Sequence, residues 1–221
     1  MGKIFDMDSP IMRFLTTMAD LMILNILTLI CCIPIITVGA SLTALNYVML
    51  KIVRNEEGYI VKSFFKSFKQ NFRQATIIWL FILAFILIFA GDILIFNYAS
   101  IEFPKALKIF LFVLALVVAM VTAYVFPVLS RFDNTVMHTV KNALFMSLLS
   151  FPKTILMLIL YAMPVALFYL TPMAVPLIFM FGISIPVYFS AMLYNGTFKK
   201  FEPEEEPIGD RFETGNENDV N

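Results

Sequence analysis

The sequence predicts an all-α protein that crosses a membrane several times as a polytopic helix bundle. Of its 221 residues, 60% are hydrophobic and only 14% are charged, and the mean hydropathy is +0.86. A soluble domain carries about 25% charged residues. The apolar residues also come in runs longer than strands or buried core helices need. Both observations make lipid the natural solvent for most of the chain.

Four long runs contain no charged residue: 21–50, 74–91, 109–130 and 154–198. A helix of about 20 residues crosses the ~30 Å hydrocarbon layer, so the second and third runs fit one helix each. As a single helix the last run would be roughly 67 Å long at ~1.5 Å per residue, so it must fold back. The first run is also too long for one span.

Prolines mark where these two runs reverse. Pro172 lacks a backbone donor and biases Thr171 away from the helical region, which predicts helices over 153–170 and 173–195. The segment from Pro34 to Gly39 divides the first run in the same way, into helices over 14–33 and 37–53. Whether the segment 37–53 spans completely stays open. The prediction is six transmembrane helices as three hairpins, in a single domain over 1–200.

The basic residues orient these helices, because cytoplasmic loops carry an excess of Lys and Arg. With six spans, only Lys105 and Lys108 fall outside, and the charge-free turns at Pro34 and Pro172 also face outward. A five-span arrangement would place Lys3 and Arg13 on the wrong side. We therefore expect a bacterial cell-membrane protein with both termini in the cytoplasm. The basic residues then expected inside are Lys3, Arg13, Lys51, Arg54, Lys62, Lys66, Lys69, Arg73, Arg131, Lys141, Lys153, Lys199, Lys200 and Arg211.

The first connector between hairpins, residues 59–74, has the pattern of a basic amphipathic helix on the inner leaflet. Anionic headgroups attract each near-surface cation by about 1 kcal/mol. The simpler interpretation is that this helix anchors the protein to an anionic inner leaflet. The more specific one is that it is a coupling helix that docks on a partner. Phenylalanines fill one face and cations the other: Phe64, Phe65, Phe68 and Phe72 against Lys62, Lys66, Lys69 and Arg73.

The second connector, residues 131–153, has a weaker pattern of the same kind. Asp133 or Asn134 can cap a helix there, and Phe151-Pro152 ends it before the next span. The segment 201–221 is acidic and polar, which predicts a disordered cytoplasmic tail.

Polar residues and prolines inside the expected spans are the candidates for function. Asp20 and Asp92 are the ionisable ones, and each lies close enough to a helix end to reach interfacial water. Asn25, Thr28, Asn46 and Thr122 suit hydrogen bonds between helices. Kinked helices can expose backbone to a substrate, although ordinary spans tolerate proline too. The candidate kink positions are Pro127, Pro164, Pro176 and Pro186.

The residues present do not predict an enzyme, a metal site or a cofactor site. Cys31 and Cys32 are adjacent in an apolar run, and we expect them to pack as small hydrophobic residues. His138 is the only histidine and lies in a connector. No phosphate-binding glycine loop is present, and the acidic residues of the spans are isolated. Zero net charge gives no reason to expect nucleic acid.

Two stretches resemble the YesL family of bacterial membrane proteins, a domain of unknown function. One contains Thr37-Val38-Gly39-Ala40, then 50–59 and 64–72, and the other runs from Arg131 through Leu144. Ala40 departs from the family, which often has Pro there. The resemblance implies a Gram-positive context beside genes for sugar uptake and glycoside hydrolysis, but it supplies no active-site residues.

Two functions follow as hypotheses. The first is a non-enzymatic membrane protein, accessory or regulatory to carbohydrate uptake, that contacts subunits of a sugar transporter or a sensor protein through its basic connector. The alternative is a small-solute transporter acting alone, suggested by the prolines of the last hairpin and by Asp20 and Asp92.

Overall fold

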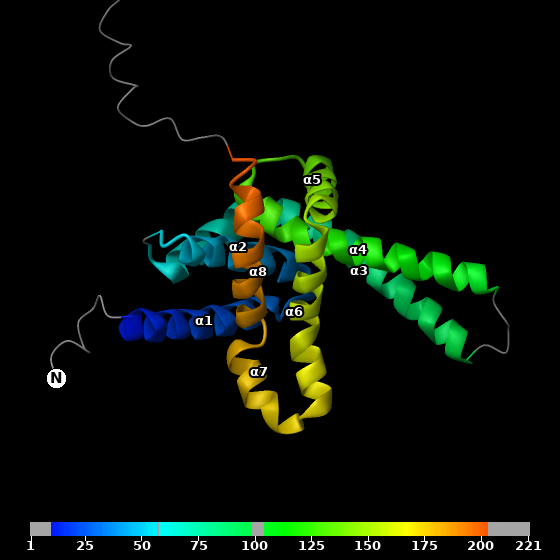
Figure 1. Cartoon of the computed structure of the whole chain (residues 1–221), viewed down its shortest axis with the longest axis horizontal. Helices are drawn as coiled ribbons and strands as arrows, with labels where there is room; N and C mark the ends of the chain where they lie inside the picture. Colours follow the sequence, from blue (N-terminus) through cyan, green and yellow to red (C-terminus); the bar gives the residue numbers. More distant parts are fainter. Residues whose placement is uncertain (1–9, 57, 99–103, 203–221) are drawn as a thin grey trace, which may run out of the picture.

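The computed structural model describes residues 10–56, 58–98 and 104–202, and this part of the chain is helical without strands. The predicted all-α class is therefore confirmed. Figure 1 shows α3 and α4 side by side as an arm, and α6 with α7 as a leg that runs in a different direction. In chain order the elements are α1 (Pro10–Cys32), η1 (Ile35–Thr37), α2 (Val38–Val53), α3 (Ile60–Tyr98), α4 (Lys105–Arg131), α5 (Val136–Leu149), α6 (Phe151–Leu170), η2 (Pro172–Ala174), α7 (Val175–Phe181) and α8 (Ser184–Phe198).

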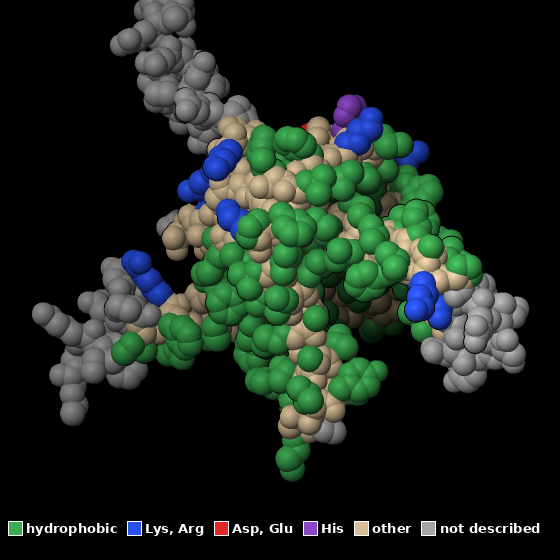
Figure 2. All heavy atoms as spheres, turned by 45° about the vertical axis from the view of Figure 1, so that its right-hand side comes forward, with side chains coloured by type: hydrophobic (Ala, Val, Ile, Leu, Met, Phe, Trp, Pro, Cys, Tyr) green, Lys and Arg blue, Asp and Glu red, His purple; other side chains and the backbone are tan. Residues whose placement is uncertain are grey.

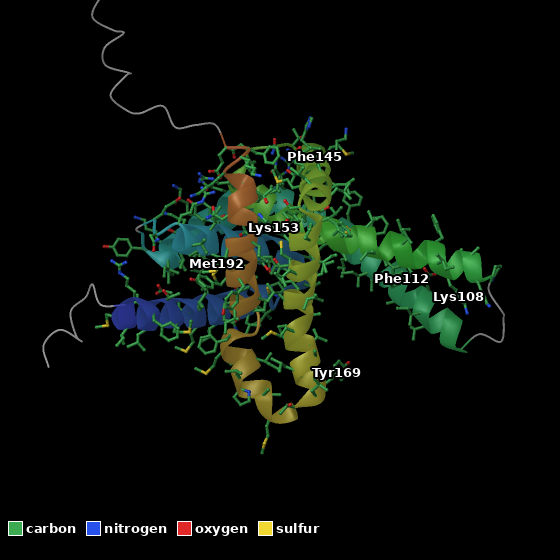
Figure 3. All side chains as sticks on the ribbon, in the orientation of Figure 1. Lys108, Phe112, Phe145, Lys153, Tyr169 and Met192 are labelled. Carbon is green, nitrogen blue, oxygen red and sulfur yellow. The ribbon has the colours of Figure 1, made fainter. Side chains whose placement is uncertain are left out.

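Several helices are long and apolar enough to cross a membrane. Five single segments qualify, and the pair α7 and α8, bent by 47°, makes a sixth if it counts as one span. Many large apolar side chains point away from the bundle, such as Phe112 on the arm and Tyr169 at the tip of the leg (Figure 3). Apolar side chains also cover much of the surface in Figure 2. A surface of this kind is stable in lipid and not in water, so the chain is a multi-pass membrane protein.

Both predicted reversals are present. Pro34 is extended, with φ −75° and ψ 118°, so α1 ends at Cys32 and η1 turns the chain into α2. Thr37 closes this turn, because its Oγ1 donates to the backbone oxygens of Pro34 at 2.6 Å and Cys31 at 2.5 Å. At the other reversal α6 ends at Leu170, directly before Thr171 and Pro172. Local proline chemistry accounts for both turns.

The last hairpin differs from the prediction of one helix over 173–195. It breaks between Phe181 and Ser184 into α7 and α8. As a consequence, Pro176 and Pro186 lie in the first turns of α7 and α8, where the missing N–H costs nothing, and they are not kinks inside a helix. Only Pro127 and Pro164 lie inside described helices.

The first basic connector is not a separate interfacial helix. It continues into the third span as α3, whose 39 residues reach about 58 Å at ~1.5 Å per residue. No proline or glycine interrupts residues 60–90, so the helix has no local reason to stop where the cations end. The second connector does form its own helix, α5. Its N-cap is Thr135 without a side-chain cap bond, and Asp133 and Asn134 do not cap it.

The helix α2 lies at the centre of the bundle and packs along the first half of α3. A Cβ atom at Gly39 would collide with the Ala75 carbonyl oxygen and lie 2.7 Å from the Trp79 Cβ. The Trp79 Nε1 donates to the Ile35 oxygen at 2.7 Å. The turn between α1 and α2 therefore lies beside Trp79, only about 9 Å along α3 from Arg73.

Candidate functional site

A cavity of about 970 Å³ lies between the arm and the leg and is the candidate binding site. Its walls come from seven helices, and the surface is hollowed between arm and leg in Figure 2. Lining residues run along α3 from Trp79 to Ile93, a length of about 21 Å at ~1.5 Å per residue. The cavity is therefore elongated along α3.

One end of the cavity is closed by the core and the other is open. At the closed end Asn46, Ala123 and Phe126 are at most 4% exposed. At the open end Ile93 and Val165 are each 59% exposed. Because the residues around the mouth are apolar, the cavity opens onto the lipid-facing surface of the bundle.

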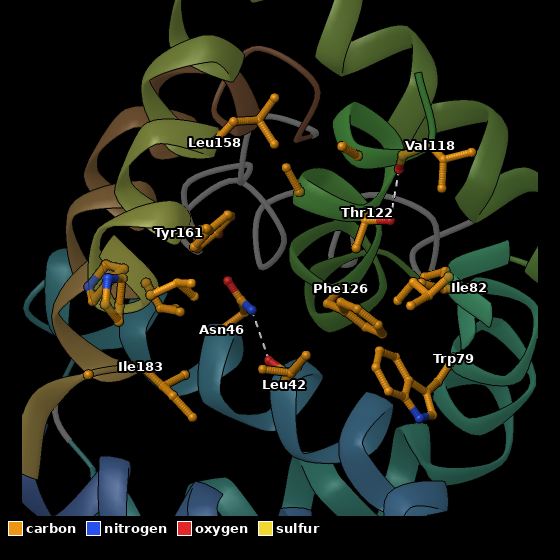
Figure 4. A pocket seen from close by; sticks show the side chains of 18 of the residues that line it. Leu42, Asn46, Trp79, Ile82, Val118, Thr122, Phe126, Leu158, Tyr161 and Ile183 are labelled. Atoms are coloured by element: carbon orange, nitrogen blue, oxygen red, sulfur yellow. Dashed lines mark hydrogen bonds between the residues drawn. The ribbon is translucent and has the colours of Figure 1, made fainter. Parts of the chain in front are cut away.

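Most polar side chains of the wall use their hydrogen-bonding groups within the protein. Figure 4 shows Asn46 between Tyr161 and Phe126. Its Nδ2 donates to the Leu42 oxygen at 2.8 Å, and its Oδ1 accepts from Tyr194 at 3.1 Å.

Of the other three polar wall residues, Trp79, Thr122 and Tyr161, the first two are bonded in the same way. Thr122 donates to the Val118 oxygen at 2.8 Å, and the Trp79 indole N–H is bound to Ile35. Thr122 therefore bonds within its own helix and not between helices. The wall presents mainly hydrocarbon to whatever occupies the cavity.

The cavity is open at one end, so its filling comes from the surroundings of the protein. Water is a poor filling, since each molecule needs two to four polar partners. The wall offers few such partners. The cavity therefore suits an apolar occupant.

Asn25 of α1 fixes the break between α7 and α8 beside this cavity. Its Nδ2 donates to the Phe179 oxygen at 2.7 Å, and its Oδ1 accepts from the backbone N–H groups of Ile183 at 2.8 Å and Ser184 at 2.9 Å. These are backbone groups that a helix break leaves without helical partners. The Asn25 side chain thus replaces the missing helical bonds, and it is fully buried.

Neither aspartate of the spans belongs to the wall of the large cavity, although Asp92 directly precedes the wall residue Ile93 at the open end. Asp20 lines a smaller, polar cavity of about 300 Å³ with Arg13, Lys51 and Glu56. Asp92 is partly exposed on α3 and is not on the wall of either cavity. Within the part of the chain that the structure covers, no group of three His, Cys, Asp or Glu residues is placed to hold a metal ion.

The cations of α3 form one exposed row, which we call the cationic row: Lys62, Lys66, Lys69 and Arg73. The phenylalanines do not all face lipid as the pattern predicted. Phe64 is fully buried, and its ring is 6.3 Å from that of the half-buried Phe68. Only Phe65 and Phe72, 40% and 38% exposed, remain available to lipid.

A charged cluster joins the ends of α2, α4 and α8. Arg54 donates to both carboxylate oxygens of Glu202, at 2.9 and 2.8 Å, and to the Asn195 Oδ1 at 2.9 Å. Arg131 donates to the same carboxylate at 2.9 Å. Burial raises the pKa of the Glu202 carboxyl, but the bonds from Arg54 and Arg131 outweigh it and hold the pKa below its ordinary value.

Sequence patterns missed the roles of several residues because these roles depend on distant partners. Trp79, Gly39 and Arg54 act through contacts with other helices. Rarity could have identified Trp79, because it is the only tryptophan. Most of the predicted tail, 203–221, lies outside the described residues.

Comparison with known proteins adds one similarity. Residues 21–93 match the family described as Protein of unknown function, DUF624. The match contains the Thr37 turn, the contact of Gly39 with α3 and the cationic row. No curated protein and no solved structure matches the chain. The chain is thus a multi-pass α-helical membrane protein that is similar, from the middle of α1 to most of α3, to a family of unknown function.

Proposed function

We propose that this is a non-enzymatic protein of a Gram-positive cell membrane that assists or regulates carbohydrate uptake by docking a partner on the cationic row of α3. The observation behind the docking step is that Lys62, Lys66, Lys69 and Arg73 are exposed on one helix. The carbohydrate context comes from the resemblance to the YesL family. The partners this implies are transporter subunits or a sensor protein in contact with the cytoplasmic face.

The packing of α3 favours docking over simple anchoring in the inner leaflet. An anchoring helix leaves its apolar face free for lipid, whereas Phe64 is buried within the protein. The opposite face is thereby held rigidly, and a rigid surface loses less conformational entropy on binding. Four cations in a row suit an acidic partner surface, and their attraction weakens as salt is added.

Affinity purification of the tagged protein in mild detergent, with co-purifying proteins identified by mass spectrometry, tests the proposal. The test variant is Lys66→Gln with Lys69→Gln. The control is Lys199→Gln with Lys200→Gln, which removes the same charge from an exposed position at the end of α8. We expect the first pair alone to reduce recovery of a near-stoichiometric partner and growth on the transported sugar. Unchanged recovery and growth in both variants would reject docking on the cationic row.

The second candidate is a small-solute transporter that acts alone. The break between α7 and α8 beside the large cavity favours it, because broken helices are common at transporter sites. It predicts uptake by the purified protein in liposomes that Asp20→Asn or Asp92→Asn reduces. The apolar wall of the cavity, to which neither aspartate belongs, weighs against a polar solute.

A further inference from the structure

We propose that the cavity between the arm and the leg binds acyl-chain hydrocarbon of a bilayer phospholipid. The inference goes beyond the proposed function, since it concerns the membrane half of the protein and not the cationic row. It rests on the lining, the shape and the position of the mouth.

The lining selects hydrocarbon over polar ligands. Asn46, Thr122 and Trp79 already bond within the protein, which leaves the Tyr161 hydroxyl as the remaining polar side-chain group of the wall. A sugar or another polar solute would lose its hydrogen bonds to water on entering and regain few of them. A methylene chain loses none and replaces the contacts that an unfilled wall would lack.

The length of the cavity suits an acyl chain. The lining along α3 extends over about 21 Å, while one leaflet of the ~30 Å hydrocarbon layer is about 15 Å thick. An acyl chain that enters through the mouth can therefore lie along the cavity. The mouth is bordered by exposed apolar residues such as Ile93, Val165 and Phe168, which face the same hydrocarbon as the rest of the surface.

A bound chain would also touch the broken span. Ile178, Phe179, Gly182 and Ile183 belong to the wall, and they include the backbone that Asn25 holds. The chain would therefore pack against α7 and stabilise the bent arrangement of α7 and α8.

Trp79 provides the probe, because it is the only tryptophan and it lines the cavity. The protein is reconstituted in phosphatidylcholine vesicles with an increasing fraction of phosphatidylcholine brominated on its acyl chains, and quenching of Trp79 fluorescence is measured. The protein is then extracted into detergent to remove loosely bound lipid. Native mass spectrometry counts the phosphatidylcholine molecules that stay bound to it. We expect quenching by chain bromines and one retained lipid per protein.

Two variants narrow the site while Trp79 stays the only tryptophan. Ala119→Phe fills the cavity from α4, and Val165→Phe narrows the exposed mouth without changing the buried core. A phenyl ring that displaces two methylene groups should weaken lipid retention by about tenfold. The control is Ala84→Phe, exposed on α3 but not part of the wall.

Three outcomes would overturn the proposal. The first is quenching and retention that are the same in Val165→Phe, Ala119→Phe and Ala84→Phe. The second is a lipid-free dimer in which Trp79 is shielded from chain bromines, because a second copy would then close the cavity. The third is a folded monomer that retains no lipid.

Discussion

At the scale of single residues, small and polar side chains decide how helices meet in this protein. Gly39 allows the backbones of α2 and α3 to touch, while Gly91 has no atom within 4 Å of an added Cβ. Asn25 and Thr28 are both buried in α1, but only Asn25 has hydrogen-bond partners. In each pair only the first residue makes the contact, so a substitution of the second residue is a control for a substitution of the first.

Replacement of Gly39 by Val should destabilise the fold by about 1–3 kcal/mol, as overpacking does, because the new side chain collides with the Ala75 carbonyl. Gly91→Ala should be neutral or stabilising by up to about 1 kcal/mol, since alanine favours a helix. Thermal unfolding of the purified protein in detergent measures both. Equal losses in the two variants would show that α2 and α3 do not meet at Gly39.

Replacement of Asn25 by Leu should cost about 1–3 kcal/mol, because it leaves the N–H groups of Ile183 and Ser184 buried without an acceptor. Thr28→Val removes a buried hydroxyl that has no partner among the described residues, so it should cost little. The same unfolding assay compares them. A neutral Asn25→Leu would mean that the break between α7 and α8 does not depend on this side chain.

At the scale of elements, charge joins helix ends that are far apart in the sequence. The carboxylate of Glu202, four residues after the end of α8, binds Arg54 at the end of α2 and Arg131 at the end of α4. Bidentate bonds between Arg and a carboxylate are among the stronger ones in proteins. The cluster should therefore hold these three ends together at neutral pH.

The Glu202 cluster predicts a loss of stability in acid. The pKa of this carboxyl is lowered in the folded protein, so its contribution is complete above the unfolded-state pKa and disappears as the pH falls through the folded-state pKa. Glu202→Gln should therefore melt at a lower temperature than the wild type at pH 7, with the difference vanishing in acid. A difference that does not change with pH would contradict this account.

At the scale of the whole molecule, the connectivity predicts which ends share a side of the membrane. We expect Lys66 and Lys141 on one side and Lys105 on the other. Single cysteines at these positions, in a chain with Cys31 and Cys32 replaced by Ala, can be labelled with a membrane-impermeant maleimide. Intact cells should label Lys105→Cys only, and permeabilised cells should label all three. Labelling of Lys66→Cys in intact cells would reverse the orientation.

The depth of the first hairpin can be tested in the same background. The α1–α2 turn lies beside Trp79, and α3 continues for about 28 Å beyond that level. We therefore expect Ile35→Cys to resist labelling in intact cells, although a full crossing by α2 would place this turn outside. Labelling as strong as that of Lys105→Cys would show that the first hairpin crosses completely.

The sequence by itself determined the class, the number of candidate spans and both proline reversals, because hydrophobic run length and proline geometry act locally. Pro34 and Pro172 turn the chain where their backbone restrictions predict. The absence of proline and glycine over 60–90 is a local feature too, and it could have predicted that the basic segment continues as α3. Only the tertiary structure decided that Asn25 holds a broken span and that arm and leg enclose a cavity. Each depends on contacts between residues far apart in the chain, which periodicity and composition do not encode.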